Sequence, residues 1–213
     1  PRSTLFPYTT LFRSDNEVIK MIQTIQNFKK SKYAPNEQFK TLLRSYQLEG
    51  FKWLKTLSSY DFGGILADDM GLGKTLEIIS FVDSDSKQAP SLIVCPMSLV
   101  YNWENECHKW NLNCPIHLIL GSIEERENII SNINPNAKSL CITSYDSLRR
   151  DANLYKIKFR FVIADEAQFI KNQFAQKSEA IKSIQSEINF ALTGTPIENG
   201  LADLWSIFDS ILQ

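Results

Sequence analysis

The sequence predicts an α/β protein in which a parallel β-sheet is flanked by helices on both faces. Two observations lead to this fold class. From residue 63 onward, short apolar stretches alternate with amphipathic stretches, and the polar connections between them are short. This alternation is typical of parallel sheets, whose strands are buried on both faces. We expect strands at residues 64–67, 91–95, 116–120, 138–142, 159–164 and 188–192.

The predicted helices occupy the amphipathic stretches. Two precede the first strand, because apolar residues recur at spacings of three and four within residues 15–30 and again within residues 45–59. Residues 31–40 contain Pro35 and Asn36 and are predicted to be a linker. Residues 15–40 then form either the end of an upstream domain, which the linker favours, or a brace on the main domain. The other helices are expected near residues 74–82, 98–110, 123–132, 144–150, 175–185 and 201–211.

Composition and charge are those of an ordinary globular protein. The chain has 213 residues, 43% hydrophobic and 22% charged, which is long enough for one domain with a sizeable core. A net charge of −1 gives no global basic field, so a nucleic acid would be held by local contacts. No apolar run approaches the roughly 18 residues that span a bilayer, and we expect no membrane partner.

The four cysteines are too sparse for a disulfide framework, which favours a reducing cytosol. Cys107, His108, Cys114 and His117 lie close together in the sequence and are candidate metal ligands. Their spacing matches no common zinc pattern, so we expect ordinary, partly buried side chains.

Residues 4–14 look like a translated sequencing adapter, and this likeness covers the whole segment. A signal peptide is the alternative, but Pro7 and Tyr8 interrupt any continuous apolar core. We therefore expect residues 1–14 to be a non-native, disordered tail.

The segment 63–75 carries the most informative motif. A short apolar stretch runs into a glycine-rich turn, and Lys74 and Thr75 open an amphipathic stretch. Glycines let backbone N–H groups close on phosphate oxygens at a helix N-terminus. The lysine can reach the β- and γ-phosphates, and the threonine hydroxyl can bind magnesium. Asp68 stands where the general pattern has glycine, so a tight turn with an exposed lysine is the alternative.

A second motif, residues 161–166, is an apolar strand that ends in Asp165 and Glu166. Ligands of parallel sheets bind at the carboxyl ends of the strands, where these acids are expected to lie. One carboxylate can complete a magnesium shell, and the other can orient the attacking water. Two acids at a strand end could also be merely solvated, but a separate lysine-bearing glycine loop favours a nucleotide site.

Together these motifs resemble the Swi/Snf-type helicase-like ATPases of helicase superfamily two. Residues 69–75 are similar to the family's phosphate loop, residues 165–168 to its acidic motif, and residues 192–199 to the motif that couples nucleotide state to DNA. The resemblance covers the chain from about residue 42. It implies that residues 41–213 are the first of two RecA-like lobes, that ATP and Mg²⁺ are the cofactors, and that double-stranded DNA and DNA-bound proteins are the partners.

The resemblance also implies residue roles. The catalytic residues would be Lys74, Asp165 and Glu166, and Mg²⁺ would be held by Thr75 and Asp165. The ATP-binding residues would be Arg44, Gln47, Asp69, Met70, Gly71, Leu72, Gly73, Lys74 and Thr75, with Gln47 reading the adenine edge. The DNA-contacting or coupling residues would be Pro96, Ser98, Ser144, Tyr145, Thr193, Gly194, Thr195 and Asn199.

The residues around Ser98 and the nearby tryptophans have simpler interpretations. As an alternative to a DNA contact, the sole role of Ser98 could be to cap the N-terminus of the helix predicted at residues 98–110. The tryptophans of the same helix, Trp103 and Trp110, are expected to be packing residues rather than base-stacking ones.

The function that we expect is an ATPase lobe that moves along duplex DNA, in the bacterial cytoplasm at the nucleoid or in a eukaryotic nucleus. An RNA helicase lobe is an alternative, but Gln168 replaces the usual aspartate and residues 193–195 replace Ser-Ala-Thr. A non-catalytic nucleotide-gated module is opposed by the presence of Lys74, Thr75, Asp165 and Glu166.

A second lobe would supply arginine fingers, which are worth ~10³–10⁵ in rate in related systems. The printed sequence does not include such a lobe. We therefore expect the 213-residue chain by itself to bind ATP weakly and to hydrolyse it negligibly.

Overall fold

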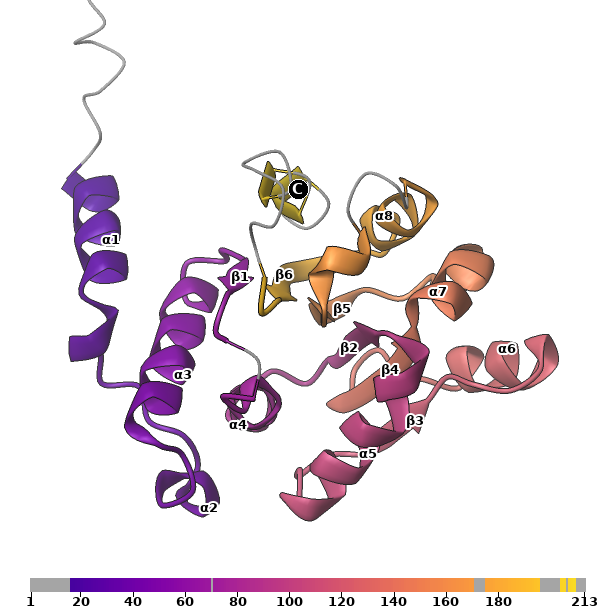
Figure 1. Cartoon of the computed structure of the whole chain (residues 1–213), viewed down its shortest axis with the longest axis horizontal. Helices are drawn as coiled ribbons and strands as arrows, with labels where there is room; N and C mark the ends of the chain where they lie inside the picture. The colour runs from indigo at the N-terminus through magenta and orange to yellow at the C-terminus, as the bar shows by residue number, and fades with distance from the viewer. Residues whose placement is uncertain (1–15, 70, 171–174, 196–203, 206, 210–213) are drawn as a thin grey trace, which may run out of the picture.

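A six-stranded, all-parallel sheet with helices on both faces forms the centre of the molecule (Figure 1). The structure is a computed structural model that describes residues 16–69, 71–170, 175–195, 204–205 and 207–209. The strand order β1-β6-β5-β2-β4-β3 confirms the predicted fold class. Each strand boundary lies within two residues of its predicted position, and the strands are β1 (Gly64–Leu66), β2 (Pro90–Cys95), β3 (Ile116–Leu118), β4 (Ser139–Ser144), β5 (Phe159–Ala164) and β6 (Ser186–Leu192).

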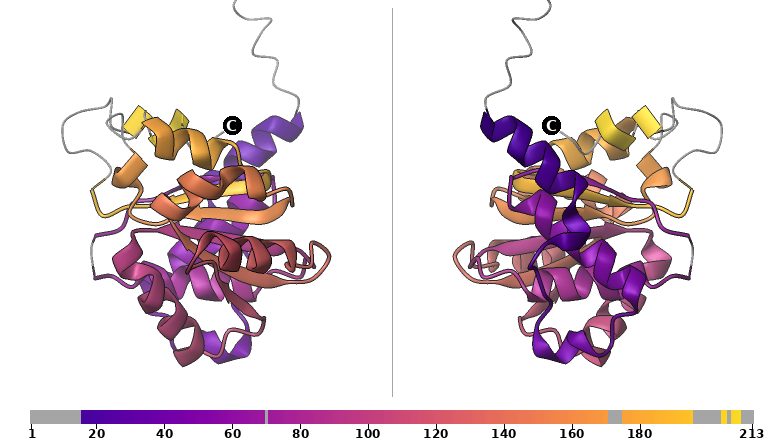
Figure 2. Two further views of the ribbon diagram at one scale, coloured as in Figure 1. Left: turned by 90° about the vertical axis from the view of Figure 1, so that its right-hand side faces the viewer. Right: turned by 90° about the vertical axis from the view of Figure 1, so that its left-hand side faces the viewer.

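The helices divide between the two faces of the sheet, as Figures 1 and 2 show. One face is covered by α3 (Ser45–Ser58), α4 (Lys74–Asp83) and α5 (Val100–Lys109). The other is covered by α6 (Ile123–Ser131), α7 (Tyr145–Asp151) and α8 (Ala175–Lys182). Residues 204–205 and 207–209 are helical as well, within the stretch predicted at 201–211. The helix predictions for these regions are therefore confirmed.

Alternate side chains of β2, β4 and β6 enter two separate cores. In β2, Ile93 packs with Phe51, Phe81 and Trp103 on the α3–α5 face. Its neighbour Leu92 packs instead with the α6–α8 face, next to Leu148. Because successive strand residues point to opposite faces, a strand that is apolar at every position is what a sheet covered on both sides requires.

The helix predicted at residues 15–30 is present, and it packs on the main domain. Helix α1 (Asn16–Gln26) and the 3₁₀ turn η2 (Phe28–Lys30) lie along α3, where Lys29 forms an ion pair of 2.7 Å with Glu49. The linker predicted at residues 31–40 is wrong, because it contains α2 (Glu37–Lys40) and Phe39 is fully buried in the core. The Asn36 amide also donates to Asp83 Oδ2 at 2.6 Å.

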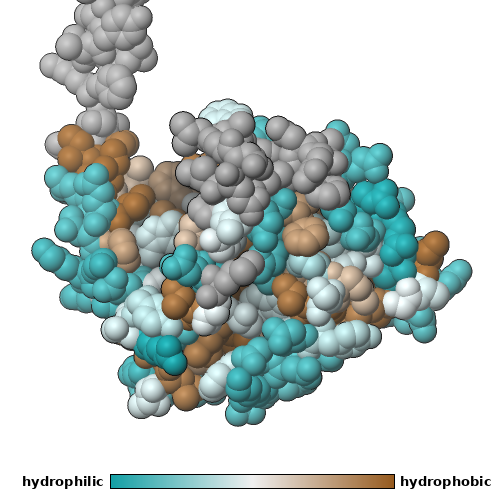
Figure 3. Space-filling view, viewed as in Figure 1, coloured by the Kyte–Doolittle hydropathy of each residue, from teal (hydrophilic) through white to brown (hydrophobic). Residues whose placement is uncertain are grey.

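One side of α1 is apolar and exposed, with Val18, Ile19 and Ile22 each about 40% accessible. Figure 3 shows this apolar patch at the upper left, next to the grey tail. The adapter-like residues 1–14 lie outside the described residues. Within the described residues, no helix is long and apolar enough to cross a membrane.

The candidate metal ligands Cys107 and His108 lie in different environments. Cys107 is buried in the core, where burial raises the pKa of its thiol to about 12, whereas His108 on the next position of α5 is exposed. In the part of the chain that the structure describes, no group of three or more His, Cys, Asp or Glu side chains could hold a metal ion.

A buried ion pair fastens α6 to α7. The Arg126 guanidinium donates from Nε to Asp151 Oδ2 at 2.5 Å and from Nη2 to Asp151 Oδ1 at 2.9 Å. Nη1 donates to the Gly121 carbonyl oxygen at 2.6 Å, so the same side chain fixes the turn before α6. Both side chains are about 95% buried, which makes an unpaired Arg126 costly.

We predict that Asp151→Ala lowers the free energy of unfolding by about 3–5 kcal/mol, because it leaves a buried guanidinium without its partner. Urea denaturation followed by circular dichroism measures this change. The matched control is Glu37→Ala, which removes the acid of the exposed Lys40–Glu37 pair and should cost at most about 1 kcal/mol. Equal losses in the two variants would contradict the assignment.

Candidate nucleotide-binding site

The three predicted motifs meet at one edge of the sheet. In a parallel sheet the carboxyl ends of all strands lie at the same edge. β1 leads into the glycine loop, β5 into Asp165, and β6, which lies between them, into Thr193. The Thr193 N–H donates to the Leu66 carbonyl oxygen at 3.2 Å, which joins the end of β6 to the start of the loop.

The loop requires glycine at two positions. Gly71 and Gly73 have φ angles of 82° and 85°, in the left-handed region that residues with a Cβ rarely adopt. Gly73 is also the N-cap of α4, and a Cβ there would lie 2.4 Å from the Gln47 amide nitrogen. The loop therefore ends at a helix N-terminus, which is the geometry of an anion site. Met70 lies outside the described residues.

The Lys74 ammonium lies over this loop. Its Nζ donates to the carbonyl oxygens of Asp68 at 2.7 Å and Asp69 at 3.1 Å. The acceptors of the Lys74 ammonium are thus two neutral carbonyl oxygens. The oxygens of a phosphate are negatively charged and would accept stronger hydrogen bonds from the same ammonium. The adjacent Thr75 is half-buried at the start of α4. The loop thus fits a phosphate group.

Gln47 was predicted to read the adenine edge, but in the structure its side chain amide is hydrogen-bonded to protein backbone groups. Its amide nitrogen donates to the Leu72 carbonyl at 2.9 Å, and its amide oxygen accepts from the Arg44 N–H at 2.9 Å. The Tyr46 hydroxyl, which the sequence analysis missed, donates to the same Leu72 carbonyl at 3.1 Å. In this conformation Gln47 is buried and shapes the phosphate loop from α3, while the Arg44 side chain is exposed.

Asp165 is held from several directions at the end of β5. Its Oδ2 accepts from the Trp103 indole N–H at 2.8 Å, and its Oδ1 accepts from the Glu166 backbone N–H at 2.9 Å. Burial raises the pKa of this carboxyl to about 6, and the Lys74 ammonium is close enough to oppose that shift. Lysine and acid therefore belong to one site. A buried carboxylate of this kind, with acceptor capacity left over, fits a divalent cation.

Glu166 has an unusual backbone, with φ at 51°. A non-glycine residue in this region costs about 1–3 kcal/mol and such residues cluster at active sites. Its Oε2 accepts from the Gln168 amide at 2.6 Å. The Gln168 amide oxygen in turn accepts from the Thr193 hydroxyl at 3.0 Å, and that hydroxyl accepts from the Thr195 N–H at 3.1 Å. A continuous chain of hydrogen bonds thus joins Glu166 to the residues after β6.

The predicted DNA-contacting residues lie in different environments. Ser98 is exposed and Pro96, Gly194 and Thr195 are half-buried. The Ser98 capping interpretation is wrong, because a 3₁₀ turn (Met97–Leu99) starts after Pro96 and Ser98 makes no capping bond. Asn199 lies outside the described residues.

Ser144 and Tyr145 are buried rather than presented at the surface, with 2% and 1% of their area accessible. Ser144 caps α7 by accepting from the Ser147 N–H, and the Tyr145 hydroxyl donates to the Asp165 carbonyl at 2.7 Å. A direct contact of these two side chains with DNA is therefore not available in this structure. The physical reason is that both side chains are already used to fix the start of α7 and the end of β5.

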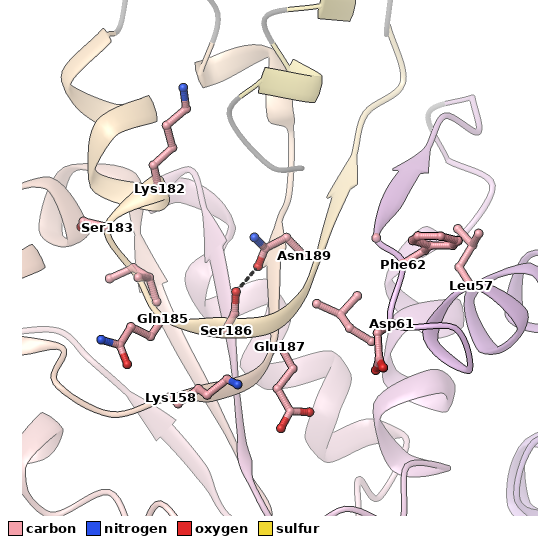
Figure 4. A pocket seen from close by; sticks show the side chains of 13 residues that line it. Leu57, Asp61, Phe62, Lys158, Lys182, Ser183, Gln185, Ser186, Glu187 and Asn189 are labelled. Atoms are coloured by element: carbon pink, nitrogen blue, oxygen red, sulfur yellow. Dashed lines mark hydrogen bonds between the residues drawn. The ribbon is translucent and has the colours of Figure 1, made fainter. Parts of the chain in front are cut away.

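A cavity of the described residues lies away from these side chains. It has a volume of about 660 Å³ and is lined by residues at the amino ends of strands, among them Asp61 before β1, Lys158 before β5 and Glu187 at the start of β6 (Figure 4). These residues place it at the amino edge of the sheet, opposite Lys74 and Asp165. It has no glycine loop and no buried acid, so the site that the motifs define is the other edge.

A buried acid lies beneath the phosphate loop. Glu77 of α4 is fully buried, and neither carboxylate oxygen has a hydrogen-bond partner. It faces Gly50 of α3, where a Cβ would lie 2.0 Å from Glu77 Oε2. Burial, with a smaller contribution from Asp68, raises the pKa of Glu77 to about 8, and Lys74 opposes the shift.

Comparison with known proteins identifies the class. The model of the SNF2-related domain matches residues 46–213, and the chain belongs to this family. It is 43% identical over 176 residues to the uncharacterized ATP-dependent helicase MG018 of Mycoplasma genitalium, covering 80% of this chain and 17% of that protein. It is 38% identical over 186 residues to the TATA-binding protein-associated factor mot1 of Schizosaccharomyces pombe, covering 80% of this chain and 9% of that protein.

A solved structure shows the same fold. The SWI2/SNF2 ATPase core of Sulfolobus solfataricus in complex with dsDNA matches with a TM-score of 0.69 and 38% identity, covering 80% of this chain and 36% of that chain. The chain thus spans about a third of this core and less than a quarter of the two relatives. Membership of this family implies the use of a nucleotide.

We predict that Glu77→Gln raises stability at pH 8 but not at pH 5. The unfolded carboxyl loses its proton near its ordinary pKa of 4.5, whereas the folded one keeps it up to about 8. The stability of the wild type is therefore fully present below about pH 4.5 and falls as the pH rises toward 8, on the order of 1.4 kcal/mol per pH unit. Urea denaturation at pH 5 and pH 8 measures the difference.

The matched control for this measurement is Glu127→Gln, which removes a carboxylate that is exposed on α6. It should leave the pH dependence of the wild type unchanged. The same gain for Glu77→Gln at both pH values would show that charge burial is not the cause.

Proposed function

We propose that this chain is the ATP-binding lobe of an ATPase that is stimulated by duplex DNA and moves along it. The observation that carries the proposal is the meeting of two motifs at one edge of the sheet. The loop that bears Lys74 follows β1, and Asp165 and Glu166 follow β5, far away in the sequence. The family and the archaeal core in complex with dsDNA support the choice of reaction and of nucleic acid.

The glycine loop would hold the phosphates through its backbone N–H groups. Lys74 would exchange the carbonyl oxygens of Asp68 and Asp69 for phosphate oxygens, a change from neutral to charged acceptors. Thr75 and Asp165 would hold Mg²⁺, which neutralises charge on the β- and γ-phosphates. Arg44, Gln47, Asp69 and the glycines would complete the nucleotide site.

Glu166 would orient and activate the attacking water. Its backbone is left-handed, and the Gln168 amide holds one carboxylate oxygen. Because Gln168 also binds Thr193, a shift of the residues after β6 would reach the Glu166 carboxylate through two hydrogen bonds. This supports residues 193–195 as the coupling segment.

Duplex DNA would lie along the segments that follow β2 and β6. Met97 and Tyr101 are about half accessible, and Ser98 beside them is exposed. With a net charge of −1 the chain relies on such local contacts rather than on a basic field. DNA-bound proteins are proposed as further partners, as the name of the mot1 relative suggests. We place the protein in the bacterial cytoplasm at the nucleoid, or in the nucleus of a eukaryote.

We predict that Glu166→Gln in the full-length protein lowers ATP turnover by about 10²–10⁴-fold and leaves ATP affinity nearly unchanged, because it removes a base but no phosphate contact. Lys74→Ala should instead weaken ATP binding itself. Phosphate release measures turnover, and a fluorescent ATP analogue measures affinity.

The same assay tests the nucleic acid. Turnover of the wild type should rise with duplex DNA and not with RNA of equal length. Unchanged turnover in Glu166→Gln would favour a non-catalytic nucleotide-gated module, and stimulation by RNA alone would favour an RNA helicase lobe.

A further inference from the structure

Two buried aromatic side chains converge on Asp165 from different helices. The Trp103 indole of α5 donates to the carboxylate Oδ2 at 2.8 Å, and the Tyr145 hydroxyl of α7 donates to the Asp165 backbone carbonyl at 2.7 Å. Each aromatic side chain is 1% accessible. One bond fixes the carboxylate, and the other fixes the peptide that carries it.

We propose that Trp103 and Tyr145 are positioning residues for Asp165, an inference that rests on the proposed role of Asp165 in holding Mg²⁺. Each carboxylate oxygen can accept two hydrogen bonds, and the structure gives each oxygen one, from Trp103 and from the Glu166 backbone. The carboxylate is therefore oriented but keeps acceptor capacity for a cation. Groups that orient a metal ligand in this way typically affect metal affinity by about 10–100-fold.

One of the two donors, Trp103, lies close in sequence to a segment that the proposed function places along DNA. Trp103 lies on α5 one turn after the segment Pro96–Leu99, and Tyr145 is the first residue of α7. The Tyr145 ring also stacks on Phe169, at 6.2 Å between centroids and 10° between planes. A displacement of the start of α5 by bound DNA would therefore move a group that holds Asp165.

A purely structural role would look different. Buried tryptophan and tyrosine usually find a hydrogen-bond partner, whichever group is near. Loss of such a bond lowers stability but does not change how strongly Mg²⁺ improves nucleotide binding. The dependence of nucleotide affinity on Mg²⁺ separates the two roles.

The test uses the full-length protein and a fluorescent ATP analogue, with affinity measured in excess Mg²⁺ and in EDTA. Trp103→Phe keeps an aromatic ring but removes the donor, and Tyr145→Phe removes only the hydroxyl. The matched control is Trp110→Phe, at the C-cap of the same helix, whose indole donates to Glu106 Oε2 at 2.7 Å. The ratio of the two affinities should fall about 10-fold in Trp103→Phe, also fall in Tyr145→Phe, and stay unchanged in Trp110→Phe.

Affinity in EDTA should be the same in all three variants, since the Lys74 loop is untouched. An equal loss in Mg²⁺ and in EDTA, or a wild-type ratio in both Trp103→Phe and Tyr145→Phe, would overturn the proposal. A wild type that binds the analogue in neither condition would overturn the proposed function itself, and this proposal with it.

A spectroscopic readout tests the link to DNA without turnover. In the ¹⁵N-labelled protein, the Trp103 indole signal, assigned by its loss in Trp103→Phe, should shift when Mg²⁺ and nucleotide bind and again when duplex DNA is added. The Trp110 indole signal should move in neither case. A Trp103 signal that is insensitive to both additions would contradict a positioning role.

Discussion

The candidate site depends on the position of β6 between β1 and β5. A parallel sheet brings every carboxyl end to one edge, but only this strand order places the lysine-bearing loop, the paired acids and Thr193 side by side. The hydrogen bond from the Thr193 N–H to the Leu66 carbonyl closes the join between loop and coupling segment. Asp165 is largely buried, which raises the pKa of its carboxyl, and the Lys74 ammonium opposes this shift. A nucleotide with its metal ion would complete a site that the sheet alone has already brought together.

Much of this arrangement could be predicted from local sequence. The strands are short apolar runs bounded by polar loops, and each lies within two residues of its prediction. The glycines at 71 and 73 lie in one short segment, and the acids after β5 lie in another, so a motif identifies each pair without tertiary information. The order of the strands in the sheet could not be predicted in this way, because local sequence patterns do not indicate which strands are neighbours.

The failures have a common physical cause. Phe39 is fully buried because it meets the core around α4, and nothing within residues 31–40 indicates that contact. Gln47 binds the loop about 25 residues away, and Tyr145 binds Asp165 20 residues away. Trp103 was expected to pack, which it does, but its donor to Asp165 appears only when α5 and β5 are placed together. The motifs identified Gln47 and Tyr145 as functional positions, but they did not give the hydrogen-bond partners of these side chains.

The most direct test of the central claim is a crystal structure of the protein with Mg²⁺ and a non-hydrolysable ATP analogue. We predict that the Lys74 ammonium leaves the Asp68 and Asp69 carbonyls for phosphate oxygens, and that the metal ion lies between the Thr75 hydroxyl and the Asp165 carboxylate, at about 2.1 Å from an oxygen ligand that binds it directly. A nucleotide bound at the amino edge of the sheet, with Lys74 still on its loop carbonyls, would contradict this account.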